Sequence, residues 1–459
     1  MSATHQRCKE LAQPSFALSH DALPEPCKSD QRHAVTWRRA LAFLPIRGNK
    51  VGLPDHGIMA QANESHITQT LADVLRAIPA GDRAAVTRLE PDYLLCSAIT
   101  HGVVGLLFER VCELGLDATP AVERLREYAT AAAVWELRHQ QVLGTTLTQF
   151  AQAGIQPILL KGTALAYSLY TKPLLRSRGD TDLLVRDDQK EEAAALLAAN
   201  GFERRQTPSG QFISYQDSYS LRAKDSTVHV IDLHWQPMNS VRLSRVFNYD
   251  ELLQRAVPLP KLGRMAKGPG AVDALLIACV HRLTHVTHPY FVGDTVSFDA
   301  DRLIWLYDIH LLSESLEPVE WHTAVALAQA KSIGSILLNG LAAAHTRFDT
   351  AYPTWVADAL VSTNDTEPLH EHLASGPITQ YAQTLKTMDS LADRVRFLKE
   401  LLLPSSEYMR GGYEGGRNGW MPLLYARRIM RGGLGKMKQE RSRRRSERAA
   451  DVVGHGERR

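Results

Sequence analysis

The stretch Ile155–Val185, IQPILLKGTALAYSLYTKPLLRSRGDTDLLV, decides the fold of the region around it. Its apolar start predicts a short buried strand over Ile158–Leu160, followed by a turn at Lys161–Thr163 and a helix. A basic loop comes next, and a second strand then begins at Asp180 and carries Asp182. This order places polar side chains at the ends of buried strands, where a rigid scaffold can hold a catalytic site.

The carboxylates of Asp180 and Asp182 predict a metal site. Side chains at positions i and i+2 of a strand share a face, so these two project side by side, with Thr181 on the other face. Two carboxylates held this close repel each other unless a cation lies between them, and hard oxygen ligands suit Mg²⁺. The alternative is a solvated surface pair, because an isolated Asp-x-Asp is a weak signal.

The turn before the helix predicts a phosphate site. Gly162 directly follows a buried strand, so backbone N–H groups can approach a phosphate closely, and the helix dipole favours negative charge there. Lys161 and Thr163 add a cation and a hydroxyl. The P-loop pattern GxxxxGK[ST] is absent, so this is a different kind of phosphate turn.

A third acid follows about fifty residues further on. The run Thr227–Trp235, TVHVIDLHW, is rich in β-branched residues and predicts a strand. Its alternation puts Ile231 and Leu233 on one face and Asp232 and His234 on the other. If this strand neighbours the first acidic pair, three carboxylates and a glycine turn suit two-metal phosphoryl transfer, with ions about 3.5 to 4 Å apart.

These motifs resemble those of the bacterial nucleotidyltransferase family in the polymerase-beta-like superfamily, over a region from about Ile67 to about Arg431. The resemblance implies an α+β fold, with a small mixed sheet between helical regions, and Mg²⁺ with a nucleoside triphosphate as donor. Better-characterised relatives have Gly-Ser at the turn, whereas this chain has Gly162-Thr163, which keeps the hydroxyl. The motifs that carry the resemblance are Leu160-Lys161-Gly162, Arg178-Gly179-Asp180-Thr181-Asp182-Leu183-Leu184-Val185 and Ile231-Asp232-Leu233-His234-Trp235.

The resemblance also assigns roles to the motif residues. Asp180, Asp182 and Asp232 are expected to be catalytic and to hold two Mg²⁺ ions. The expected reaction moves an NMP group from an NTP, such as ATP, to a hydroxyl-bearing acceptor and releases pyrophosphate. The acceptor stays open between a small molecule, a sugar and a peptide or protein. The residues expected to bind the nucleotide are Lys161, Gly162, Thr163 and Arg178, with a loop salt bridge as the alternative role for Arg178.

A helix predicted from Ala271 carries His281, His285 and His288 on one face. Three roles stay open for these imidazoles, namely zinc binding, lining the acceptor pocket and structural hydrogen bonding, although HExxH is absent. Downstream, Asp308 is expected to face this helix and orient an imidazole, or else to lie on a helix surface. The candidate acceptor-pocket residues are therefore His234, His281, His285 and Asp308.

The composition is that of a globular protein with two or three domains, since 459 residues are 44% hydrophobic and 22% charged. Met59 is a candidate alternative start, just before the resemblance begins. The expected organisation is a disordered extension over 1–62, an N-terminal helical region over 63–153, a catalytic core over 154–245, a C-terminal helical region over 246–425 and a basic, disordered tail over 426–459.

Charge, cysteines and apolar runs exclude several classes. The net charge is +3, yet the segment after Tyr425 carries roughly eight excess positive charges, so no specific nucleic acid partner is expected for the rest. That tail has nonspecific contact with anionic lipid or nucleic acid as an alternative to simple solvation. Five scattered cysteines without CxxC support neither disulfides nor zinc. No apolar run reaches about 20 residues and no signal peptide opens the chain, so we expect no membrane span and a cytoplasmic protein.

Two rival functions stay open. The first is a noncatalytic nucleotide-binding or scaffolding protein of a biosynthetic pathway, which keeps the sheet without chemistry. The second is a metal-dependent hydrolase built on the His281 helix. Bound zinc would favour the hydrolase, whereas Mg²⁺-dependent pyrophosphate release would favour transfer.

Overall fold

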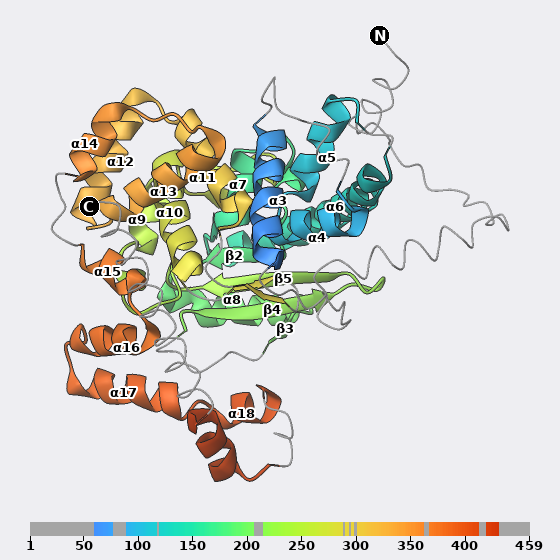
Figure 1. The fold of residues 1–459 in the computed structure, drawn as a ribbon. Coiled ribbons are helices and arrows are strands. Elements are labelled where there is room, and N and C mark those ends of the chain that lie inside the picture. The colour runs from blue at the N-terminus through green and yellow to red at the C-terminus, as the bar shows by residue number, and fades with distance from the viewer. Residues whose placement is uncertain are drawn as a thin grey trace. The chain divides into compact units, whose positions relative to one another are not determined.

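The computed structural model describes residues 59–76, 89–116, 119–205, 214–287, 290–292, 295–297, 301–361, 367–412 and 419–430 (Figure 1). The chain divides into two compact units. The first contains residues through Trp135 together with Val292–Asp294, and the second contains Glu136–Phe291 and the chain from Thr295 onward.

The first unit is helical. Helix α4 starts where Glu90 accepts hydrogen bonds from the backbone N–H groups of Asp92 and Tyr93, and it ends at Gly102, whose φ of 71° is left-handed. Because of this end, the apolar run over residues 94–114 forms two helices. His101 is buried and its Nε2 lies 3.0 Å from the hydroxyl of Thr68, so it is a packing residue with a hydrogen bond. The helices are α3 (Met59–Leu75), α4 (Pro91–His101), α5 (Val104–Glu113) and the first part of α6 (Pro120–Gln152).

The second unit contains a mixed five-stranded sheet in the order β1-β2-β5-β4-β3. Strand β2 pairs with β1 in the antiparallel direction and with β5 in the parallel direction, whereas β4 is antiparallel to both β5 and β3. The strands are β1 (Ile158–Leu160), β2 (Thr181–Leu184), β3 (Glu203–Arg204), β4 (Gln216–Arg222) and β5 (Val228–His234).

Helices pack on this sheet around one apolar core. The end of α6 contributes Leu143, Leu147 and Phe150, which pack with buried strand residues such as Leu183 and Ile231. Two further helices complete the core, namely α7 (Lys161–Ser168) and α8 (Lys190–Ala199). The carboxylate strand is therefore fixed by packing on the central strands rather than by a flexible loop.

The rest of the second unit is largely helical, which completes the expected α+β fold. Short strand segments lie at β6 (Val257–Pro258), β7 (Lys267–Gly268), β8 (Tyr290–Val292) and β9 (Thr295–Ser297), and 3₁₀ turns at Pro173–Leu175, Asp187–Gln189 and Leu243–Arg245. The helices are α9 (Tyr249–Gln254), α10 (Ala271–Thr287), α11 (Leu303–Ser315), α12 (Pro318–Ala330), α13 (Gly334–Phe348), α14 (Thr354–Val361), α15 (Pro368–Ala374), α16 (Pro377–Lys386), α17 (Leu391–Leu402) and α18 (Ser406–Gly412), with residues 421–430 also helical.

Helix α3 begins at Met59, inside the extension that we expected to end at residue 62. Residues 426–430 are helical, although we placed them in the basic tail. The remainder of both predicted extensions, residues 1–58 and 431–459, lies outside the described residues.

Candidate functional site

Strands β2 and β5 bring two of the predicted carboxylates together. Their parallel register pairs Thr181 with Ile231 and Asp182 with Asp232, so the two acids lie on neighbouring strands at the same level. His234, at the end of β5, joins them, and one ligand atom from each of Asp182, Asp232 and His234 lies within 4.8 Å of the other two. Within the described parts of the chain this is the group of side chains suited to a metal ion.

Lys161, the first residue of α7, lies beside this group. Its φ is 50°, a left-handed conformation that a residue with a β-carbon rarely adopts. This backbone places the ammonium 2.7 Å from Oδ1 of Asp182. Desolvation opposes the charge of Lys161, yet attraction from Asp182 and the other two acids outweighs it and raises its pKa. Of the two directions that we left open for Lys161 (towards phosphate or towards the carboxylates), the structure has the second.

The pKa values of the three acids diverge. Desolvation would raise the pKa of Asp182, but Lys161 and the hydrogen bond from His234 lower it far below its usual value. Desolvation and then the charge of Asp182 raise the pKa of Asp232. Asp180 precedes β2 and is exposed, yet surrounding protein atoms desolvate its carboxylate, and together with Asp182 and Asp232 they raise its pKa to about 7. Three acids with one ammonium leave excess negative charge, which a cation would offset.

The donor atoms fit a hard divalent cation. Oδ2 of Asp232 accepts a hydrogen bond from Gln216 at 3.0 Å, whereas its buried Oδ1 has no partner among the described residues. Buried carboxylate oxygens are nearly always paired, so an unpaired one beside a second acid is a natural ligand position. Asp180 lies outside the close group, although the charges of both other acids act on it.

His234 was expected in an acceptor pocket, and the structure places it elsewhere. Its Nε2 lies 2.8 Å from Oδ1 of Asp182, and the side chain is fully buried. The imidazole therefore holds the Asp182 carboxylate in its orientation, as hydrogen-bond partners of metal ligands commonly do. Its sequence signal was the i, i+2 spacing from Asp232, which predicted the face of β5 correctly.

A neutral polar chain lies on the opposite side of β2. The hydroxyl of Thr181 lies 2.7 Å from Nε2 of His139 and 3.0 Å from the hydroxyl of Thr163, which also reaches the backbone oxygen of Asp180. Nδ1 of His139 lies 3.2 Å from Nδ1 of His229. Burial lowers the pKa of both imidazoles, with further lowering by Arg178 at His139 and by Arg138 at His229. The Thr163 hydroxyl, which we expected to contact the nucleotide, is thus buried in this chain.

Arg178 forms the salt bridge that was the alternative to nucleotide contact. Its Nη2 lies 2.7 Å from Oε1 of Glu136, and the guanidinium lies 5.5 Å from the centre of the Tyr167 ring. The hydroxyl of Tyr167 donates to the same Glu136 oxygen at 2.5 Å. Arg178 therefore joins α6, α7 and the loop before β2.

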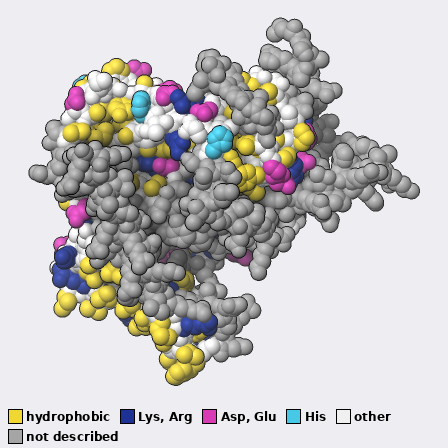
Figure 2. Space-filling view, viewed as in Figure 1, with side chains coloured by type: hydrophobic (Ala, Val, Ile, Leu, Met, Phe, Trp, Pro, Cys, Tyr) yellow, Lys and Arg dark blue, Asp and Glu magenta, His cyan; other side chains and the backbone are white. Residues whose placement is uncertain are grey.

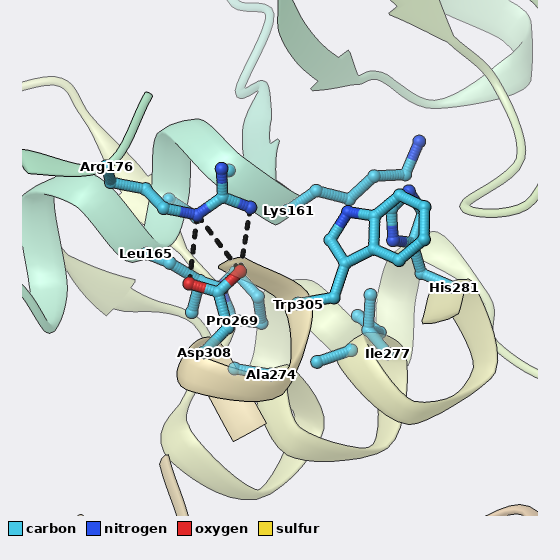
Figure 3. A pocket seen from close by; sticks show the side chains of 12 residues that line it. Lys161, Leu165, Arg176, Pro269, Ala274, Ile277, His281, Trp305 and Asp308 are labelled. Atoms are coloured by element: carbon cyan, nitrogen blue, oxygen red, sulfur yellow. Dashed lines mark hydrogen bonds and ion pairs between the residues drawn. The ribbon is translucent and has the colours of Figure 1, made fainter. Parts of the chain in front are cut away.

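Arg176, two residues earlier, is a residue that sequence reasoning missed. Its guanidinium binds both carboxylate oxygens of Asp308 on α11, with distances of 2.7 to 3.0 Å (Figure 3). Tyr170 donates to Oδ1 of Asp308 at 2.7 Å. A β-carbon on Gly162 would lie 3.5 Å from this guanidinium, so Arg176 rests on the predicted phosphate turn. Asp308 is consequently neither a surface acid nor an orienting group for an imidazole.

A small pocket of ≈ 30 Å³ lies beside this ion pair (Figure 3). Lys161, Gly162 and Arg176 line one side, and His281, Trp305 and residues of α10 line the other. His281 and Asp308, two of the candidate acceptor-pocket residues, thus line one pocket, which adjoins the predicted phosphate turn. That this pocket takes the acceptor stays a prediction. Burial lowers the pKa of His281 well below its usual value, so its imidazole is neutral.

His285 is not part of that lining. Its ring stacks on Trp305 with 5.4 Å between centroids, and His281 meets both rings edge-on. His288 lies outside the described residues. The only group of metal-binding type within the described ranges is the one on β2 and β5, so the described part of the histidine face offers no comparable site.

A family model described as "Uncharacterised nucleotidyltransferase" matches residues 87–349, which is more than half of the chain. The chain belongs to this nucleotidyltransferase family. The matched range covers the carboxylate group, the turn at Gly162 and the pocket, so the family resemblance found in the motifs is confirmed.

A crystal structure of an antigenic nucleotidyltransferase-like protein from Paracoccidioides brasiliensis is similar at 17% identity, over 43% of this chain and 91% of that one, with a TM-score of 0.25. No curated protein matches the chain. Among the described residues of this nucleotidyltransferase, no helix is both long and apolar enough to cross a membrane.

Proposed function

We propose that this nucleotidyltransferase moves an NMP group from an NTP to a hydroxyl-bearing acceptor in a Mg²⁺-dependent reaction that releases pyrophosphate. The observation that carries the proposal is the pairing of Asp182 with Asp232, whose buried Oδ1 has no partner among the described residues. Family membership supports the NTP as donor. An acidic pair beside a cationic turn is the arrangement that phosphoryl transfer requires.

Asp182 and Asp232, with Asp180 at the rim, are the residues that would hold Mg²⁺. When bound, the ion would neutralise triphosphate charge and favour in-line attack on the α-phosphorus. The raised pKa values of Asp180 and Asp232 support this assignment, because both reflect negative charge that a cation would offset.

The remaining residues bind and position. Lys161, held against Asp182, contributes positive charge on the side where the triphosphate would lie. Gly162 presents the backbone of the first turn of α7 to the β- and γ-phosphates. The hydroxyl of Thr163 contacts the backbone oxygen of Asp180 and the hydroxyl of Thr181. Arg178 forms an ion pair with Glu136. We therefore assign Thr163 and Arg178 a positioning role.

Transfer of the NMP group forms one bond to the α-phosphorus and breaks another. The acceptor oxygen forms a new bond to the α-phosphorus, and the bond from that phosphorus to the bridging oxygen breaks. The bridging oxygen leaves with the electron pair as part of pyrophosphate. Asp232, whose pKa is raised, takes the proton of the acceptor hydroxyl.

The test is pyrophosphate release and label transfer. The purified chain is incubated with Mg²⁺ and each of the four α-labelled NTPs, together with small-molecule, sugar and peptide or protein acceptor pools, and products are identified by mass spectrometry. We expect labelled acceptor and stoichiometric pyrophosphate. Asp232→Asn should lower the rate by roughly 10³-fold or more, because the base and a ligand oxygen are both lost.

The control is Asp188→Asn, at an exposed aspartate whose ion pair with Arg186 lies on the surface. It should leave the rate unchanged. Nucleotide binding without pyrophosphate release by the unaltered chain would contradict the proposal and favour a noncatalytic nucleotide-binding protein. Tightly bound zinc with hydrolysis of an unrelated substrate would favour the metal-dependent hydrolase instead.

A further inference from the structure

We infer that the C-terminal helices of this protein dock on an anionic lipid surface, through an apolar face formed by α17 and the helix over residues 421–430. This inference is independent of the proposed reaction. It rests on where the exposed apolar side chains lie, on how the two helices are joined and on the charge of the chain that follows them.

Exposed apolar side chains are concentrated in this part of the chain. Of the sixteen large hydrophobic side chains exposed among the described residues, ten lie between Ile378 and Met430. Figure 2 shows yellow side chains gathered over the lower part of the molecule, where Figure 1 has α16, α17 and α18, with dark blue Lys and Arg side chains at the borders. Scattered apolar residues need no explanation, but a contiguous group of this size indicates an interaction surface.

Helix α17 is apolar on two sides. Phe397 on one side is buried against Val241 and Met388. On the other side, apolar residues recur at intervals of four, three and four positions, which is one face of a helix. A helix with a second apolar stripe is incomplete without something to cover it. The exposed stripe consists of Leu391 (75% exposed), Val395 (58%), Leu398 (39%) and Leu402 (43%).

The helix over 421–430 extends this surface. The hydroxyl of Tyr425 donates to the backbone oxygen of Pro404 at 2.7 Å, and Arg428 reaches the backbone oxygen of Leu401 at 3.5 Å. These bonds join the helix to the end of α17, whose neighbour Leu403 is half exposed. Next to this junction, Trp420, Leu423, Ile429 and Met430 are 72%, 60%, 44% and 60% exposed.

The positive charge of the neighbouring sequence indicates that the partner is negatively charged. The segment after Tyr425 carries roughly eight excess positive charges, including Arg427 and Arg428 beside the apolar residues. An apolar helix face with Trp and Leu, next to a dense run of Lys and Arg, is what anionic membrane surfaces attract. A second copy of the chain would bring two such basic segments together, and their repulsion disfavours self-association.

The experiment uses the full chain with lipid vesicles. Co-sedimentation is measured with vesicles of phosphatidylcholine alone and with vesicles that contain about one third phosphatidylserine, at low and at physiological salt. We expect binding to the anionic vesicles, at least about tenfold weaker binding to neutral ones, and a decrease with salt, because screening weakens surface electrostatics.

Two sets of variants separate the apolar and the basic contributions. The double variant Trp420→Ser with Leu423→Ser removes exposed apolar area, and a variant with Arg441, Arg443, Arg444 and Arg445 replaced by Glu reverses charge. Each should weaken binding to anionic vesicles by roughly tenfold or more. Val319→Ser is the matched control, because Val319 is 70% exposed on α12 and lies outside this surface. Circular dichroism and thermal unfolding should be unchanged in the Trp420 and Leu423 double variant and in Val319→Ser, since these side chains are exposed, and both are measured for the arginine variant as well.

Three outcomes would overturn the inference. The first is equal or absent binding to neutral and anionic vesicles. The second is binding that the Trp420 and Leu423 double variant leaves intact. The third is a dimer in light scattering that this double variant dissociates, which would make a second copy of the chain the partner.

Discussion

The two faces of strand β2 differ in charge, although they are formed by the neighbouring residues Thr181 and Asp182. On one face, Asp182 lies beside Asp232 and Lys161, and the acids leave a negative charge that a bound cation would offset. On the other face, Thr181 meets His139 and Thr163 in a closed chain of neutral groups. The charged face therefore carries mutual repulsion between acids, whereas the neutral face holds the strand in place through paired polar groups.

The largest expected effect comes from breaking the charged face at Asp182. Asp182→Asn removes the carboxylate that both Lys161 and His234 contact, so NMP transfer should fall by roughly 10³-fold or more. The fold should persist, because the apolar core around β2 is untouched, although the free energy of unfolding should fall since Lys161 loses the carboxylate it contacts. Steady-state pyrophosphate release and circular dichroism check the two expectations, and a variant that keeps full activity would remove Asp182 from the mechanism.

A smaller effect is expected from breaking the neutral face at Thr181. Thr181→Val keeps the shape but removes the hydroxyl that Nε2 of His139 contacts, which should lower the free energy of unfolding by about 1 to 3 kcal/mol. Transfer should fall less than for Asp182→Asn. Urea unfolding measures the loss, with Thr148→Val as control, since the exposed Thr148 bonds only within its own helix. An equal decrease in the free energy of unfolding for both variants would mean that the buried hydrogen bonds of Thr181 contribute no more to stability than an exposed one.

The smallest expected effect is the pH dependence of the neutral face. His139 and His229 have lowered pKa values, so below about pH 6.5 the unfolded chain binds protons that the folded chain does not. The free energy of unfolding therefore decreases as pH falls below about 6.5, by about 1 kcal/mol per pH unit for each imidazole that stays neutral in the folded chain. Asp180 and Asp232, whose pKa values are raised, act in the opposite direction over the same pH range. The contribution of His139 is therefore the difference between the unaltered chain and His139→Gln in urea unfolding at pH 7.5 and 5.5, and the unaltered chain should lose more stability than the variant. An unchanged slope in the variant would show that His139 titrates normally.

The sequence predicted much of the charged face. Strand Ile158–Leu160 has the expected bounds, and alternation along β5 placed Asp232 and His234 on the expected side. The reason is that strand periodicity and the acidic spacing are local signals. The resemblance to a nucleotidyltransferase family was also visible in three short motifs.

The neutral face and the Arg176 ion pair could not be predicted in the same way. His139 lies 42 residues from Thr181, and Asp308 lies 132 residues from Arg176. Neither pair shares a helix or strand, so no local periodicity joins them, and only the packed structure brings them into contact. For the same reason the two arginines of one loop, Arg176 and Arg178, could not be told apart by sequence.

The left-handed backbone of Lys161 has a consequence for how this protein can change. A β-carbon in that conformation costs on the order of 1 kcal/mol, and glycine would avoid the cost. Glycine would also remove the ammonium beside Asp182. A single substitution at position 161 therefore cannot both relax the backbone and keep a positive charge beside Asp182.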